Sequence, residues 1–127
     1  MTARRFEYAV TERWGEPPRV EPDWTPEHFV LAGLARCMLT ALDFHAKRRN
    51  IGVSGTAAAS GVVTKRDDDG RYAFVDVRAG LEVELDPLPD RESVAELLEL
   101  AERDCFIGAS LTAPPHYVWR VNGAHVQ

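Results

Sequence analysis

The sequence predicts an α+β fold, in which antiparallel sheets pack around a long central hydrophobic helix. Three observations favour this fold. The chain has 127 residues, close to the length of one domain, and we treat 1–127 as a single domain. Strand-like stretches stand on both sides of one strongly apolar helical stretch. The elements follow the order strand, helix, hairpin, helix, strand, which is typical of an α+β domain.

The first half of the chain contains a strand and the central helix. Residues 4–14 alternate bulky and polar side chains, which predicts a strand with one buried face. A connector with three prolines follows, so neither a central strand nor a helix can continue there. Thr25 and Pro26 then mark a helix start, and the pattern runs to about residue 49. Between Phe29 and Leu42 only Arg36 and Thr40 interrupt the apolar run, so this helix must be covered on nearly all sides.

The second half predicts a hairpin over residues 53–85, a helix over about 90–104 and a last strand over 116–122. The acidic turn at 67–70 separates two runs of strand formers. Asp90 opens the second helix, whose apolar residues recur at helical spacing. Tyr117 and Trp119 in the last strand are expected to pack in the core.

Composition excludes several classes of protein. The net charge is −5, so no surplus of Lys and Arg is evident for binding nucleic acid. There is no run of 18 apolar residues and no apolar segment at the N-terminus, which argues against a membrane span and secretion and favours the cytoplasm. Two cysteines are too few for a structural zinc site, and the four histidines show no metal-ligand spacing. The acidic turn lacks the later glutamate of a calcium loop.

Cys37 and Cys105, which lie 68 residues apart, leave two alternatives open. In a reducing compartment such a pair is either inert core packing or a transient redox pair. A reactive thiolate needs a nearby cation. Glu27, ten residues before Cys37, can border the same pocket and hold an arginine there, and Arg13 and Arg19 of the connector region can approach it. Full coverage of the apolar helix also predicts a second subunit.

Two cysteine-bearing segments resemble one family. The first is Thr25-Pro-Glu-His-Phe-Val-Leu-Ala-Gly-Leu-Ala-Arg-Cys37, and the second is Ala101-Glu-Arg-Asp-Cys-Phe-Ile-Gly-Ala-Ser-Leu111. Both resemble the OsmC/Ohr family, the osmotically inducible protein C and organic hydroperoxide resistance proteins. In that family the central helix begins with Pro-Glu, and its reactive cysteine follows the glutamate by ten residues. The resemblance covers roughly residues 22–122.

This resemblance implies an intertwined homodimer with the OsmC-like fold and a cysteine-based peroxidase activity with an antioxidant role. Cys37 would be the peroxidatic cysteine, Cys105 the resolving cysteine, and Glu27 the carboxylate that orients an arginine, for which Arg19 is the nearest match. No bound cofactor or metal is implied. The substrate would be a small organic hydroperoxide, and the reductant an external dithiol, either a lipoyl protein or a thioredoxin-like donor.

Two departures from the family pattern keep a second function open. The N-terminal region is shorter, since only eight residues separate Arg19 from Glu27. Phe106 and Gly108 stand where proline and serine are common in the family. The alternative is a non-enzymatic dimeric protein with the same fold that binds apolar ligands.

Overall fold

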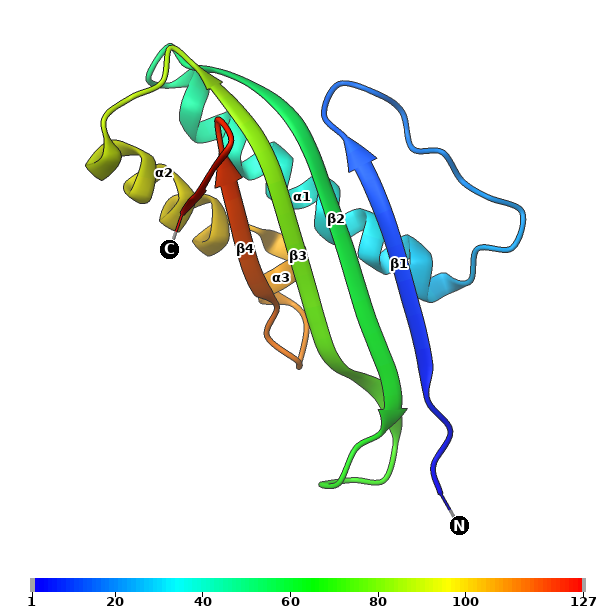
Figure 1. Ribbon diagram of the computed structural model, residues 1–127. Helices are drawn as coiled ribbons and strands as arrows, with labels where there is room; N and C mark the ends of the chain where they lie inside the picture. Colours follow the sequence, from blue (N-terminus) through cyan, green and yellow to red (C-terminus); the bar gives the residue numbers. More distant parts are fainter. Residues whose placement is uncertain (1, 127) are drawn as a thin grey trace.

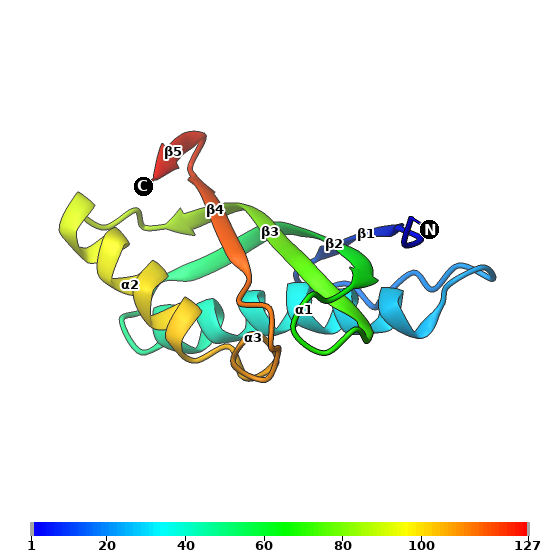
Figure 2. The same cartoon turned by 90° about the horizontal axis from the view of Figure 1, so that it is seen from below.

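A single five-stranded sheet packs with one face against the helices (Figure 1). The computed structural model describes residues 2–126. The view from below shows two layers, with α1 and α2 on the same side of the sheet (Figure 2). The strands, in sheet order, are β1 (Phe6–Arg13), β2 (Gly52–Lys65), β3 (Tyr72–Asp86), β4 (His116–Val121) and β5 (Ala124–Val126), and the helices are α1 (Pro26–Lys47), α2 (Arg91–Arg103) and α3 (Phe106–Ala109).

The strand pairing departs at one point from the antiparallel pattern that the sequence predicts. β1–β2, β2–β3 and β4–β5 are antiparallel, but β4 lies parallel to β3. A parallel neighbour requires a long crossover, and here the crossover contains α2 and α3. The sequence did not predict α3 or β5, because four and three residues are too few to show a period.

Small residues on β2 allow α1 to lie close to the sheet. Ala57 and Ala59 are buried, and they lie on the same face of β2 as Gly61. A Cβ atom on Gly61 would lie 2.6 Å from the Phe74 ring and 3.3 Å from Leu31 of α1. Larger side chains along this face of β2 would therefore push the helix away from the strand.

The opposite face of α1 is left uncovered by this chain. Phe29 and Phe44 keep 52% and 55% of their surface exposed, and Val30 is also exposed. The expectation that the helix is covered on nearly all sides is thus met only on the side of the sheet and α2. By length and composition α1 could also cross a membrane, but more than half of its most apolar stretch is buried within this fold.

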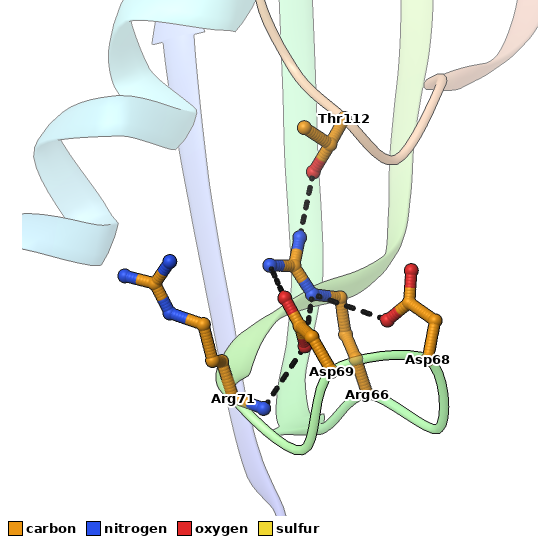
Figure 3. Close-up of polar contacts among 5 residues, drawn as sticks. All are labelled: Arg66, Asp68, Asp69, Arg71 and Thr112. Atoms are coloured by element: carbon orange, nitrogen blue, oxygen red, sulfur yellow. Dashed lines mark hydrogen bonds and ion pairs between the residues drawn. The ribbon is translucent and has the colours of Figure 1, made fainter.

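The acidic turn between β2 and β3 binds an arginine (Figure 3). Arg66 Nη2 lies 2.6 Å from Asp69 Oδ2, and Arg66 Nε lies 3.8 Å from Asp68. The Asp69 carboxylate also accepts a hydrogen bond of 3.0 Å from the Arg71 amide. On its other side Arg66 donates to Thr112 Oγ1 at 3.3 Å, which ties the turn to the segment before β4.

Gly55 provides a test of how closely the backbones of β2 and β3 approach each other. Its φ of +135° is accessible almost only to glycine, and a Cβ there would lie 2.1 Å from the Glu82 carbonyl oxygen. We expect Gly55→Ala to lower the free energy of unfolding by at least about 1–3 kcal/mol. Gly80→Ala on β3, where a Cβ would meet nothing within 4 Å, is the matched control. Urea denaturation of both variants measures the difference. Equal stabilities would contradict the close approach of the β2 and β3 backbones at Gly55.

Candidate functional site

The two cysteines meet where α1 passes the end of α2. Both are free thiols, and Cys105 is fully buried whereas Cys37 is half-buried. Their side chains are close enough for hydrogen bonding and charge on Cys37 to act on the pKa of Cys105. The fold therefore brings together two side chains that are 68 residues apart in the sequence.

Cys105 lies between two helices rather than within one. α2 ends at Arg103, and Cys105 is the N-cap residue of α3. Its sulfur accepts a hydrogen bond of 3.4 Å from the Gly108 amide. The extended backbone of an N-cap residue turns the Cys105 side chain back toward the start of α3, and so fixes its direction.

Burial makes Cys105 a weak acid. Burial is the largest cause that raises the pKa of the thiol to about 11. The hydrogen bond from the Gly108 amide lowers the pKa, whereas the hydrogen bond to Cys37 and the charge on Cys37 raise it further. At neutral pH Cys105 is therefore a thiol. A buried thiol of this kind reacts poorly with a peroxide but can donate its proton to a neighbouring sulfur.

Tyr117 is a third member of the site, although the sequence predicts it only as a residue of the core. β4 presents Tyr117 and Trp119 to the helices; Trp119 is buried, and its indole N–H donates to Glu102 at 2.8 Å. The Tyr117 hydroxyl instead lies beside Gly108, near the Cys105 sulfur. The pKa of Tyr117 is raised to about 12. Burial is the largest cause, followed by the charges of Cys105, Glu102 and Cys37 and by a hydrogen bond to Cys105. No motif marks this residue, because its place depends on the register of β4 against β3.

Glu27 lies apart from Cys37 within one chain. Ten residues of helix separate their Cα atoms by about 15 Å along the axis of α1. Glu27 is half-buried, and within residues 2–126 it has no hydrogen bond or ion pair. The next residue, His28, caps the helix: its Nδ1 accepts from the Thr25 amide at 2.8 Å, and its ring stacks on Trp24. This helical turn is therefore held in place without using the Glu27 carboxylate.

The arginines near the connector bind other acidic groups. Arg19, which is 90% exposed, lies 3.9 Å from Glu16, and Arg13 lies 3.5 Å from the same carboxylate. Arg36, although next to Cys37 in sequence, donates to Glu12 at 2.6 Å and to the Glu16 carbonyl. Across the described residues no arginine pairs with Glu27. One chain thus brings Cys37 and Cys105 together but not Glu27 and Arg19.

The residue before Cys105 is held from two sides. The Asp104 carboxylate lies 2.7 Å from His45 Nε2 of α1 and accepts two hydrogen bonds of 3.0 Å from Arg103. These contacts lower the pKa of Asp104 to about 2, and the hydrogen bonds from Arg103 have the largest effect. His45, in the last turn of α1, therefore connects this helix to the end of α2. In residues 2–126 no group of three or more His, Cys, Asp or Glu side chains could hold a metal ion.

A family model supports the resemblance of the two cysteine segments. The model described as "OsmC-like protein" matches residues 20–119. No curated protein sequence matches the chain.

Solved structures share the fold at low sequence identity. An OsmC-like protein from Mycoplasma pneumoniae is 14% identical, with 94% of this chain and 96% of that chain covered and a TM-score of 0.63. An organic hydroperoxide resistance protein OsmC from Legionella pneumophila is 16% identical, with 90% and 96% covered and a TM-score of 0.54. An OsmC-like protein of unknown function from Vibrio cholerae is 21% identical over 76% of this chain, with a TM-score of 0.58, and this chain spans 62% of its length.

The contacts of Asp104 predict an acid-dependent stability. Because its folded pKa is about 2, below the usual 3.8, the carboxylate stabilises the fold above about pH 4, and this contribution disappears as the pH falls through 2. We expect Asp104→Asn to lower the thermal midpoint at pH 6, with the difference from the unmodified protein shrinking toward pH 2. Asp23→Asn is the control, since Asp23 is exposed and has no polar partner in residues 2–126. A difference that does not change with pH would contradict this role.

Proposed function

The chain belongs to the OsmC-like protein family, and we propose that it is a thiol peroxidase that reduces organic hydroperoxides to alcohols. The observation that carries this proposal is the meeting of two unlike cysteines. Cys37 is half-exposed, and Cys105 is buried with its pKa raised to about 11. A two-cysteine peroxidase needs this difference between one sulfur open to the substrate and one kept for the second step. The name of the Legionella pneumophila structure agrees with the proposal.

The first step takes place at Cys37. Its thiolate attacks the distal oxygen of the hydroperoxide, an S–O bond forms, and the O–O bond breaks. The leaving alkoxide takes a proton and departs as the alcohol, and Cys37 becomes a sulfenic acid. Gly33 lies one helical turn before Cys37, and a side chain there would meet nothing within 4 Å, so no other part of the same chain packs over this stretch of α1. The neighbours of Cys37 on α1 are mostly apolar, which favours alkyl hydroperoxides over hydrogen peroxide.

The second and third steps use Cys105. Its sulfur attacks the Cys37 sulfur, the S–O bond breaks, and the leaving hydroxide combines with the Cys105 proton to give water. A Cys37–Cys105 disulfide results. An external dithiol, from a lipoyl or thioredoxin-like protein of the cytoplasm, then reduces it by exchange. Because Cys105 is fully buried, the peroxide has access to Cys37 alone in the first step.

We also propose that a second copy of the chain completes the site. The uncovered face of α1 carries Phe29, Val30 and Phe44, an apolar stripe of the kind that an identical helix can cover. Cys37 is half-buried on the same helix. A homodimer through this face would bring Glu27 and an arginine of one protomer toward the cysteines of the other, where Arg19 is the first candidate.

The decisive experiment treats the reduced protein with one equivalent of cumene hydroperoxide and follows thiol number and intact mass. We expect rapid loss of both thiols and a mass decrease of about 2 Da, faster than with hydrogen peroxide. Cys37→Ser abolishes turnover. Cys105→Ser stops at the sulfenic acid, about 16 Da heavier and reactive with dimedone.

Survival of both thiols for minutes would reject the peroxidase. The same result would favour the alternative, a dimeric protein that keeps the fold and binds apolar ligands. Retained turnover in Cys37→Ser would also overturn the assignment of Cys37.

The dimer has its own test. Phe44→Glu places a charge on the uncovered face of α1, and we expect the dissociation constant of the dimer to rise at least about tenfold, equal to about 1.4 kcal/mol. Val118→Glu is the matched control, an exposed apolar residue of β4 on the sheet face away from the helices. Sedimentation equilibrium measures both. An unmodified chain that sediments as a monomer, or equal dissociation constants for the two variants, would contradict the proposed interface.

A further inference from the structure

Tyr117 and Cys105 face each other across a glycine. An ideal Cβ on Gly108 would lie 2.4 Å from the Tyr117 hydroxyl oxygen and 3.4 Å from the Cys105 sulfur. Both atoms therefore border the space beside the Gly108 Cα. Gly108 is buried and helical, and its φ does not lie in the left-handed region. Its backbone can accept any residue, so the Tyr117 hydroxyl is what excludes a side chain there.

The surroundings of this hydroxyl show what it can do. Cys105, Glu102 and Cys37 are the charged or titratable groups that act on it, and Cys105 also hydrogen-bonds with it. All three carry negative charge when ionised, so the phenol keeps its proton. It can donate a hydrogen bond to a sulfur but cannot serve as a base at neutral pH. The Gly108 amide donates to the Cys105 sulfur at 3.4 Å, and the phenol is placed to be a further donor to the same sulfur.

We propose that Tyr117 is a positioning residue for the resolving step: its hydroxyl donates a hydrogen bond to the Cys105 sulfur, holds that sulfur toward Cys37, and stabilises the negative charge that develops on it. Cys105 loses its proton as its sulfur attacks Cys37, and the proton leaves with the displaced group. A hydrogen-bond donor at the attacking sulfur lowers the cost of this charge in a buried site. The role in the peroxide cycle rests on the proposed function.

The first test measures the two cysteines separately. Diamide reacts with the accessible Cys37 to give an adduct, which Cys105 then displaces to form the disulfide, so the resolving step is observed without any peroxide. We expect Tyr117→Phe to leave adduct formation unchanged. Disulfide formation slows about tenfold, because the pH profile of this step moves up by about one unit. Tyr72→Phe, which removes an exposed phenol at the far end of β3, is the matched control.

Each outcome of this test decides the proposal. An unchanged rate and pH profile in Tyr117→Phe would overturn it, and so would equal slowing of both steps, which indicates a general structural effect. A tenfold slower resolving step with diamide, in a protein that fails to react with cumene hydroperoxide, supports the role of Tyr117 and rejects the peroxidase. The two proposals can therefore fail independently.

The second test examines the geometry through a double-mutant cycle. Gly108→Ala places a methyl group where the Tyr117 hydroxyl lies, so it should destabilise the fold and slow disulfide formation. In a Tyr117→Phe background the hydroxyl is gone, and the remaining neighbours of the methyl group lie at 3.4 Å and beyond. The shift in the urea midpoint caused by Gly108→Ala should then be much smaller. Equal shifts in the two backgrounds would show that the hydroxyl does not occupy this space.

Discussion

The fit of α1 against the small residues of β2 is the constraint on which the rest of the structure depends. Because Ala57, Ala59 and Gly61 carry little side-chain volume, the helix lies close to the sheet and buries its leucines there. The same fit fixes which face of the helix is turned away. Phe29 and Phe44 lie on that outer face, and Cys37 is left half-buried. The position of the proposed reactive sulfur thus follows from the packing of the core.

The crossover between β3 and β4 assembles the rest of the site. It contains α2, Cys105 and α3, and it returns the chain in the parallel direction that brings Tyr117 back beside the cysteine. Two polar contacts fix its course. Asp104, just before Cys105, contacts His45 of α1. Thr112, just before β4, accepts a hydrogen bond from Arg66 of the hairpin turn. The segment from Asp104 to Thr112, which carries Cys105 and α3, is therefore held at both ends.

Local signals in the sequence predict much of this fold but only part of the site. The apolar run and Pro26 mark α1, and the acidic turn marks the hairpin, because these features act within a few residues of themselves. The predicted meeting of the two cysteine segments came from a resemblance rather than from their spacing. Tyr117 is predicted only as core packing, because its place beside Cys105 depends on the pairing of β4 with β3. The binding of Arg36 to Glu12 likewise joins segments that are distant in the sequence, so no local signal predicts it.

The contact between Gly108 and Tyr117 also limits how this protein can change. A residue larger than glycine at 108 collides with the hydroxyl at 117, whereas a phenylalanine at 117 would leave room for alanine at 108. The order in which the two substitutions occur therefore matters. A lineage that changes position 117 first keeps a folded intermediate, and one that changes position 108 first passes through a destabilised protein. The substitutions that this site can accept thus depend on its geometry as well as on its chemistry.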